Sequence, residues 1–245
     1  MALRLRLVAV GIEGPVNLGY IFRLSENFEV DELYLVSPTA SVAESLRWAA
    51  KASDMAWKAT VVGSLKEALR DVELSVCTSD ESSARDLLRS PVSPEQAAEL
   101  MIARKGTVAL VVGRESVGLT RDELAQCDLL CTIPASPKYT ALNVSNATAV
   151  LLYEIYKARR KSPEYEPPSR KTIALAEAYA RSLAAAVGSS EDDPGLSVRR
   201  LLSKATAAEA RHLLNLLSKA CSSLGCRDMA RRKLEELCGG PCEEA

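Results

Sequence analysis

The chain of 245 residues is poor in aromatic side chains and contains a single histidine. Phe, Trp and Tyr make up 4% of the residues, which argues against a surface that binds single strands by base stacking. The histidine, His212, lies among leucines, so a Ser-His or Cys-His catalytic pair has no support. No apolar run reaches the roughly 18 residues of a membrane-spanning helix, and Arg4 and Arg6 interrupt the apolar N-terminus, so we expect no signal peptide. We therefore expect a cytoplasmic protein.

Several common catalytic motifs are absent as well. Gly11, Gly14 and Gly19 do not have the G-x-G-x-x-G spacing of a dinucleotide-binding loop, and the Gly-Lys-Ser/Thr of a P-loop is missing. Ser116 stands one residue too far from Gly113 for the G-x-S-x-G of a nucleophile elbow. H-E-x-x-H does not occur, so hydrolysis by a zinc centre has no support. Any chemistry must therefore rest on other residues.

Charge is distributed unevenly along the chain, although the formal net charge is only −1. Residues 1–154 carry 15 Lys and Arg against 20 Asp and Glu, whereas residues 155–245 carry 16 against 12. A polyanionic partner, if one exists, would be held partly by the basic C-terminal part. An uneven but merely solvated surface explains the same numbers equally well.

The seven cysteines fall into two groups. Cys77, Cys127 and Cys131 lie in apolar surroundings, which predicts small buried side chains. The C-terminal group is Cys221, Cys226, Cys238 and Cys242, which form two pairs in sequence, 221/226 and 238/242. Neither pair has the C-x-x-C spacing typical of zinc sites, so free thiols or a disulfide are favoured and no metal is expected.

Apolar segments and helix-like segments alternate through the first 160 residues. Short Val- and Leu-rich strands, each followed by a helix, predict an α/β fold with a parallel sheet covered by helices on both faces. Helix starts are marked by Ser93 with Gln96 and by Thr120 with Glu123. The predicted strands are 5–10, 32–36, 59–62, 74–78, 108–112 and 129–133. The predicted helices are 18–27, 42–51, 65–70, 94–105 and 121–126.

A Pro-rich segment, residues 162–169, follows a last long helix predicted within residues 141–161. Its three prolines and interspersed charges predict a stiff, extended linker. Residues 170–245 are predicted to form a small helical extension, with a loop at 189–195 and a helix start at Thr206. We therefore predict two domains, residues 1–161 and 170–245.

Three stretches stand out because each follows the end of a predicted strand. Gly113 and Gly118 permit close approach of a backbone to a ligand. Loops at the carboxyl ends of neighbouring parallel strands meet at one edge, where α/β proteins bind ligands. Their backbone groups suit the adenine and ribose of a neutral or cationic cofactor better than a triphosphate. The stretches are PVNLGYIFRLSENF (15–28), VVGRESVGLTRDEL (111–124) and IPASPKYTALNVSNATAVLLYE (133–154).

These stretches resemble the three signature motifs of the SPOUT (α/β-knot) RNA 2′-O-ribose methyltransferases. The resemblance covers roughly residues 5–158, with all three motifs in order at family-like spacing. Within the TrmH/TrmJ-like members, the chain is most similar to the archaeal TrmJ type, which methylates the ribose of cytidine or uridine at position 32 of the tRNA anticodon loop. The helical extension fits the same group.

The resemblance implies a C-terminal trefoil knot of the α/β domain, formed by residues 111–150, and an obligate homodimer that binds tRNA. S-adenosyl-L-methionine would bind at the knot, a partner chain would complete the active site, and helix 143–158 would face that partner. Catalytic roles are implied for Arg23, Asn17, Glu115 and Asn143. Cofactor contacts, largely through the backbone, are implied for Thr78, Ser79, Gly113, Arg114, Gly118, Ile133, Leu142 and Asn143. RNA contacts are expected from Arg23, Lys138, Arg159, Arg160, Arg199 and Arg200.

Arg23 matches the motif-one arginine that contacts the target nucleotide. Because a guanidinium stays protonated, we expect it to act by lowering the pKa of the ribose 2′-hydroxyl and stabilising the alkoxide, with a phosphate or water as the proton acceptor. The alternative for Arg23 is a surface salt bridge with Glu26 or Glu29.

The chain departs from the family pattern at two positions. Many members have Gly at a turn where Glu29 stands, and motif three usually reads Ser-Leu-Asn, whereas Ala141 begins the same tripeptide here. Thr140 or Ser145 could replace the lost hydroxyl.

Three other functions remain as alternatives to methylation of tRNA position 32. They are methylation of rRNA or of another tRNA position, a knotted protein that binds RNA without catalysis, and a helical bundle that binds partners but no cofactor.

Overall fold

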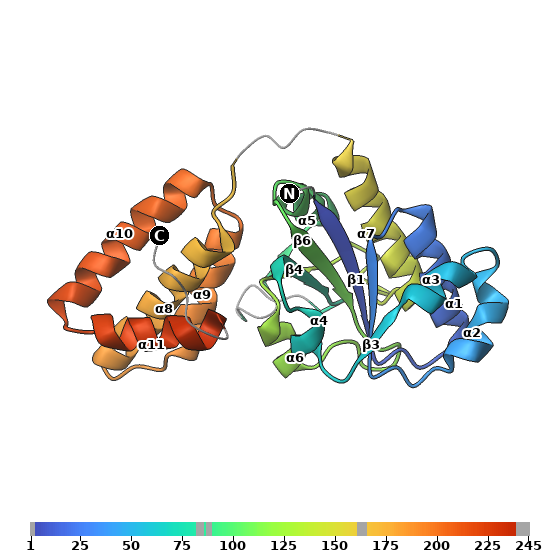
Figure 1. The fold of residues 1–245 in the computed structure, drawn as a ribbon, viewed down its shortest axis with the longest axis horizontal. Coiled ribbons are helices and arrows are strands. Elements are labelled where there is room, and N and C mark those ends of the chain that lie inside the picture. The colour runs from blue at the N-terminus through green and yellow to red at the C-terminus, as the bar shows by residue number, and fades with distance from the viewer. Residues whose placement is uncertain (1–2, 82–85, 87–89, 161–165, 239–245) are drawn as a thin grey trace. The chain divides into compact units, whose positions relative to one another are not determined.

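The computed structural model describes residues 3–81, 86, 90–160 and 166–238, and it divides into two compact units. Unit 1 spans Met1–Glu164 and unit 2 spans Tyr165–Ala245, so their boundary falls inside the Pro-rich segment. Residues 162–165 of the predicted linker lie outside the described residues. Figure 1 shows strands flanked by helices in unit 1 and helices alone in unit 2.

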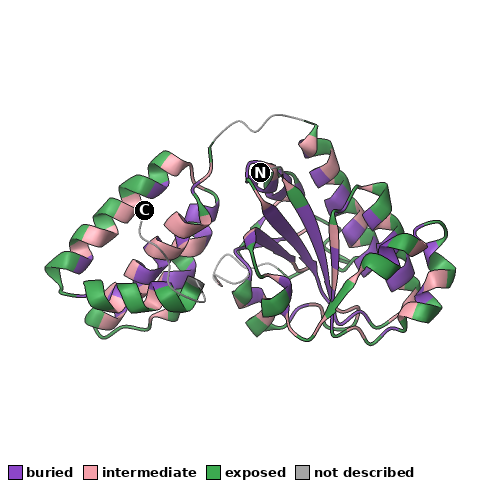
Figure 2. Ribbon diagram, in the orientation of Figure 1, coloured by how far each residue is buried: buried purple, intermediate pink, exposed green. Residues whose placement is uncertain are grey.

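Unit 1 is built on a seven-stranded parallel sheet in the order β3-β2-β1-β6-β4-β7-β5, which confirms the predicted α/β fold. β1 and β6 pair at its centre, where Leu7 lies opposite Leu110. Both strands are buried along nearly their whole length because helices cover the two faces of the sheet (Figure 2). The strands are β1 (Arg4–Val10), β2 (Glu32–Val36), β3 (Thr60–Val62), β4 (Val72–Thr78), β5 (Pro91–Val92), β6 (Thr107–Val112) and β7 (Leu129–Cys131).

Helices lie on both sides of this sheet (Figure 1). On one side α1 packs against α2, α3 and α7, and on the other α4 contacts α6. This arrangement places the start of α1, which follows β1, beside the start of α7. The helices of unit 1 are α1 (Pro15–Asn27), α2 (Val42–Ala49), α3 (Ser53–Lys58), α4 (Leu65–Ala68), α5 (Pro94–Ile102), α6 (Arg121–Gln126) and α7 (Val144–Arg159).

Local signals set several helix boundaries as predicted. Ser93 and Gln96 form a capping box at α5, and Thr120 and Glu123 form one at α6. Glu29 has a φ of 55°, in the left-handed region that favours glycine, at the turn where the family resemblance expects Gly. Side-chain capping and turn geometry are thus encoded within a few residues of each site.

Two short elements of unit 1 have no counterpart among the predicted elements. α3 has six residues, too few for a periodic apolar pattern, and it follows the reversal at Ala50, which has a φ of 53°. β5 has two residues and exists through its pairing with β7. α5 ends at Ile102 instead of residue 105, because Gly106, with a φ of 96°, begins the turn into β6.

Unit 2 consists of helices in its described part, in agreement with the predicted extension. The capping box of Thr206 and Glu209 is present at α10. α9 begins at Asp192, so the predicted loop 189–195 is wrong in its second half. A proline is tolerated at position 194 because first-turn N–H groups have no intrahelical acceptor. The helices are α8 (Arg170–Ala186), α9 (Asp192–Ser203), α10 (Ala207–Ser223) and α11 (Arg227–Cys238), of which α11 has no predicted counterpart.

A disulfide joins Cys221, near the end of α10, to Cys226, directly before α11. A disulfide is one of the alternatives that the cysteine spacing leaves open. The three cysteines of unit 1 are buried, as predicted, and none of them forms a disulfide. Cys242 and the side chain of Cys238 lie outside the described part of the chain.

Candidate active site

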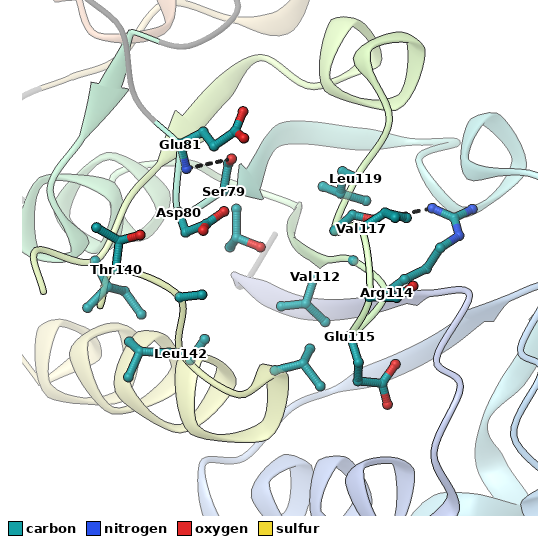
Figure 3. Close-up of a pocket in the computed structure, with 18 of the residues that line it drawn as sticks. Ser79, Asp80, Glu81, Val112, Arg114, Glu115, Val117, Leu119, Thr140 and Leu142 are labelled. Atoms are coloured by element: carbon teal, nitrogen blue, oxygen red, sulfur yellow. Dashed lines mark hydrogen bonds between the residues drawn. The ribbon is translucent and has the colours of Figure 1, made fainter. Parts of the chain in front are cut away.

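A cavity of about 380 Å³ opens at the carboxyl ends of β4, β6 and β7 (Figure 3). Neighbouring parallel strands end here, which is where open α/β sheets bind ligands. The walls come from residues 78–81, 112–124 and 131–147. Small-molecule sites typically have volumes of about 300–1,000 Å³, so the cavity can hold a cofactor.

Most residues predicted to contact the cofactor line this cavity, namely Thr78, Ser79, Gly113, Arg114, Gly118, Ile133 and Leu142. Asn143 does not line it, although Val144 next to it does. Three polar residues of the wall, Asp80, Glu81 and Ser116, were not predicted as site residues. Their position could have indicated them, because Asp80 and Glu81 follow the end of β4 and Ser116 lies in the turn after β6. Thr140, which the sequence offered as a replacement for the lost hydroxyl, also lines the cavity.

Residues 113–118 form a tight turn closed by backbone hydrogen bonds. The N–H of Arg114 donates to the carbonyl of Gly118 at 3.2 Å, and the N–H of Gly118 donates back at 3.1 Å. Gly118 has a φ of 64°, and a Cβ on Gly113 would lie 2.4 Å from the carbonyl carbon of Gly118. Glycine is therefore required at both ends to shape the cavity wall.

The side chain of Arg114 fastens this turn to α6. Its Nη1 and Nη2 donate to the two carboxylate oxygens of Glu123 at 2.9 and 3.0 Å. The hydrogen bond from Arg114 to Glu123 raises the pKa of the arginine, although burial opposes the charge. Figure 3 shows the guanidinium directed away from Asp80 and Thr140. Any contact between Arg114 and a cofactor would therefore come from its backbone.

A chain of hydrogen bonds joins the three motifs. Asn17, in the first turn of α1, donates through Nδ2 to Oε1 of Glu115 at 2.8 Å. Asn143 donates through Nδ2 to Oδ1 of Asn17 at 3.0 Å. Oδ1 of Asn143 accepts from the N–H and the hydroxyl of Ser145, at 2.9 and 2.7 Å, and so caps α7. Three of the four residues with predicted catalytic roles are thus in direct contact.

Glu115 accepts the first N–H groups before α1. Its Oε2 accepts from Glu13 N–H at 2.8 Å and its Oε1 from Gly14 N–H at 3.0 Å. Burial alone would raise the pKa of Glu115, but the hydrogen bonds from Asn17, Glu13 and Gly14 outweigh it, and the pKa is lowered. The carboxylate is therefore ionised at neutral pH, where it can orient Asn17 but cannot donate a proton.

Arg23 lies on the exposed face of α1 and outside the cavity lining. Its guanidinium lies 5.7 Å from the ring centroid of Tyr20. In the described part of the chain it forms no ion pair with Glu26 or Glu29, so the salt-bridge alternative is not supported. The charge is therefore available to a substrate.

The two candidates for replacing the hydroxyl lost at Ala141 differ in position. Thr140 lines the cavity together with Ala141. Ser145 is buried, and its hydroxyl already donates to Asn143. Thr140 is therefore the better placed of the two.

The side chains predicted to contact RNA are not equally available. Arg159 donates to the carbonyl of Glu29 at 2.9 Å and to the carboxylate of Asp31 at 2.8 Å, which ties the end of α7 to the turn after α1. The exposed members of the set are Arg23, Lys138 and Arg160.

The two arginines predicted in unit 2 are withdrawn from solvent. Arg200 is 5% exposed, and Nε of Arg199 lies 3.9 Å from the carboxylate of buried Glu177. Residues 165–245 carry 12 Lys and Arg against 11 Asp and Glu, so the basic excess of the C-terminal part lies mainly in residues 155–161. This placement does not support phosphate contacts by Arg199 and Arg200, because neither arginine is exposed.

The described residues contain neither a reactive thiol at the cavity nor a cluster of metal ligands. Cys131 borders the cavity, but burial raises its pKa to about 12, so the thiol stays protonated at neutral pH. Residues 3–81, 86, 90–160 and 166–238 hold no group of three His, Cys, Asp or Glu placed to bind a metal. No helix among them is long and apolar enough to cross a membrane.

The three stretches that resemble the motifs of α/β-knot methyltransferases thus lie together at one cavity, at the carboxyl ends of parallel strands. The chain belongs to the SpoU rRNA methylase family, whose model matches residues 4–153. Solved structures of related proteins imply that the fold includes the trefoil knot of this class, which confirms the predicted fold. Methylases of this family use S-adenosylmethionine.

Several known proteins are similar to this chain over most of their length. The tRNA (cytidine-2′-O-)-methyltransferase TrmJ of Sulfolobus acidocaldarius is 39% identical over 73% of this chain and 75% of its own. The enzyme of the same name from Methanocaldococcus jannaschii is 34% identical over 66% and 72%. The structure of a probable methylase family protein from Haemophilus influenzae Rd KW20 is 29% identical, with a TM-score of 0.64, covering 90% of this chain and 97% of that one.

The cavity lining fits S-adenosylmethionine. Apolar side chains form walls suited to an adenine ring: Val112, Leu119, Ile133, Leu142 and Val144. The carboxylates of Asp80 and Glu81 border the same space and suit ribose hydroxyls and a positively charged sulfonium.

Proposed function

We propose that the chain transfers a methyl group from S-adenosylmethionine to the 2′-hydroxyl of a tRNA ribose, at nucleotide 32 of the anticodon loop. The observation that carries this proposal is the hydrogen-bonded set of Glu115, Asn17 and Asn143 beside a cavity suited to the cofactor. The similarity to a tRNA (cytidine-2′-O-)-methyltransferase at 39% identity supports a tRNA substrate. A tRNA substrate assigns the activity to the cytoplasm.

The residues of this chain would act by placement and electrostatics. S-adenosylmethionine supplies the methyl group, which leaves its sulfonium as the ribose oxygen attacks, and the hydroxyl proton passes to a phosphate or water. Holding two reactants in line contributes about 7–11 kcal/mol. Glu115 and Asn17 fix the start of α1 against the motif-two turn, and Asn143 fixes the start of α7. Arg23 stabilises the developing alkoxide without giving up its own proton.

The active site is completed in a homodimer, because Arg23 does not line the cavity of its own chain. Exposed apolar side chains extend from α1 to α7, which pack against each other. They are Val16, Tyr20, Val150 and Tyr153, with exposed fractions of 38%, 37%, 39% and 53%. A second copy that covers this face would bring its own Arg23 toward the cavity. Sedimentation at micromolar concentration should give a dimer.

Methyl transfer from labelled cofactor to unmodified tRNA transcripts tests the function. Label should appear on the ribose of nucleotide 32 and should fall at least about 100-fold with Arg23→Ala, as for loss of a transition-state contact. Arg70→Ala is the matched control, since Arg70 is also an exposed arginine of unit 1 and lies outside the cavity lining. Unchanged turnover by Arg23→Ala would contradict the role of this residue.

The family description favours one further candidate, methylation of rRNA. The same assay with rRNA fragments separates the two substrates. Label on rRNA alone would keep the chemistry and reject the tRNA assignment. Cofactor binding without label on either RNA would leave a knotted RNA-binding protein, which the intact contact between Asn17 and Glu115 argues against.

A further inference from the structure

Both tryptophans of the chain are exposed, and they lie on consecutive helices of unit 1. Trp48, in the last turn of α2, is 44% exposed, and Trp57, on α3, is 76% exposed. The indole ring is among the largest apolar groups, so leaving it in water forfeits much of the stabilisation that burial would give. Because α2 and α3 contact each other, the two exposed rings can serve one surface that meets another molecule.

Three positively charged side chains, Arg47, Lys51 and Lys58, lie close in sequence to the two tryptophans. In the described part of the chain none of the neighbouring cations has a carboxylate at salt-bridge distance. On these helices Glu44 and Asp54 lie in the first turns, whereas Arg47 and Lys58 lie in the last turns near the tryptophans, and Lys51 follows α2. Lys58 also borders a pocket with Glu26, Asp31 and Glu32, so the positive charge is clearest at Arg47 and Lys51. All three cations are exposed.

The surface of α2 continues into the face of α1 that carries Arg23. A Cβ on Gly19 would lie 2.4 Å from Cβ of Trp48 and 2.5 Å from the carbonyl oxygen of Ser45, so the two helices touch at this glycine. Gly19 and Arg23 are one turn apart on the same side of α1. Figure 1 shows α1, α2 and α3 together on one side of the sheet. Trp48 is therefore next to the helix face of the proposed catalytic arginine.

We propose that Trp48 and Trp57, with Arg47, Lys51 and Lys58, bind unpaired nucleotides of the RNA substrate. The rings stack on bases, and the cations contact the phosphates between them. Unpaired nucleotides are the fitting ligand because only they expose base faces to a flat aromatic ring. The scarcity of aromatic residues does not exclude such a surface, since both indole rings of the chain are placed on it. The inference rests on the proposed function, because the RNA that it holds is the one presented to Arg23.

Intrinsic fluorescence tests the stacking directly, because the chain has only these two tryptophans. Titration with unmodified tRNA transcript should quench the emission. Trp48→Phe and Trp57→Phe should each retain quenching from the remaining ring. An emission that does not change at tRNA concentrations that saturate methyl transfer would overturn the proposal.

Affinity measurements provide the second test. Trp48→Ala and Trp57→Ala should each weaken tRNA binding by about fivefold or more and raise KM for tRNA, with kcat little changed. The Phe variants should recover most of the affinity, since they keep an aromatic face. Val61→Ala is the matched control, because Val61 is also apolar and 61% exposed, on β3. Calorimetry with S-adenosylmethionine should show unchanged cofactor affinity in every variant, which verifies the fold.

The outcomes separate this inference from the proposed function. Weaker RNA binding by the Ala variants, in a wild-type protein that does not methylate tRNA, would keep the surface and reject the function. Methylation at nucleotide 32 with unchanged tRNA affinity in both Ala variants would keep the function and overturn the surface, leaving the rings to a protein partner.

Discussion

Nδ2 of Asn143 donates a hydrogen bond to Oδ1 of Asn17 at 3.0 Å, across 126 residues of sequence. Asn17 uses its own Nδ2 for Glu115, so its amide is engaged at both ends. One side chain therefore couples the start of α1, the turn after β6 and the start of α7.

Replacing Asn17 by Ala should impair catalysis while leaving the cofactor bound. The change leaves Glu115 and Asn143 each without one partner, at a cost of about 1–3 kcal/mol, which corresponds to roughly 5- to 150-fold in kcat/KM. Steady-state methyl transfer measures kcat/KM, and calorimetry measures cofactor affinity. Asn27→Ala, at the other end of α1, is the matched control and should retain full activity. Equal activity of both variants would show that the network is dispensable.

The sequence was sufficient to predict the strands and helices that depend on interactions between neighbouring residues. β6 follows from its continuous apolar run, β1 from the apolar residues around Arg6, and the starts of α5 and α6 from their capping residues. Elements that exist through distant contacts could not be predicted in this way. The start of α9 is one example, since Gly195 packs against Arg181 of α8. The burial of Arg200 is another, because no local pattern distinguishes it from a solvated arginine.

The sequence likewise predicted some features of the candidate site and not others. The residue types came from the family resemblance, and their positions after strand ends indicated one shared edge. The contact between Asn17 and Asn143 could not be predicted, because it requires the fold that brings α1 and α7 together. The sequence also did not distinguish Arg23, which is exposed, from Arg159, which is held by Asp31.

The stabilising contribution of Glu115 should depend on pH. Its pKa is lower in the folded protein than its usual value, so the contribution is present above the unfolded pKa of about 4.3 and is lost as pH falls through the folded pKa. The difference in unfolding free energy between wild type and Glu115→Gln should therefore be largest at neutral pH and should shrink below about pH 4.3. Urea unfolding, followed by the fluorescence of Trp48 and Trp57, reports on unit 1.

Glu99→Gln is the control for this titration. Glu99 is exposed on α5, and no side-chain hydrogen bond holds its carboxylate in the described part of the chain. At neutral pH this variant should have almost the same unfolding free energy as wild type. A gap between wild type and Glu115→Gln that stays constant down to pH 3 would mean that the carboxylate charge does not stabilise the fold.

Replacing Gly113 by Ala should damage the cofactor site. The new Cβ would lie 2.4 Å from the carbonyl carbon of Gly118, so the turn must open. Overpacking of this kind costs about 1–3 kcal/mol, and cofactor affinity measured by calorimetry should fall about tenfold or more. Gly63→Ala is the matched control, because a Cβ there meets nothing within 4 Å and it lies outside the cavity lining. Wild-type affinity in Gly113→Ala would place the cofactor elsewhere.

The disulfide should stabilise unit 2 without affecting the active site. Cys221 is 0% exposed and Cys226 is 3% exposed, and they pack against Tyr179 and Leu183 of α8, so the bond fixes the corner between α10 and α11 to the bundle. Closing so short a loop contributes about 2 kcal/mol through the unfolded chain.

Reductant should therefore lower the thermal midpoint of the helical signal in wild type but not in a Cys221→Ser/Cys226→Ser double variant, which should melt at the lower temperature under both conditions. Cofactor affinity should be the same in all four samples, because the cavity lies wholly in unit 1. A wild-type midpoint that does not respond to reductant, with both thiols shown by alkylation to be reduced, would mean that packing around Tyr179 holds this corner without the bond.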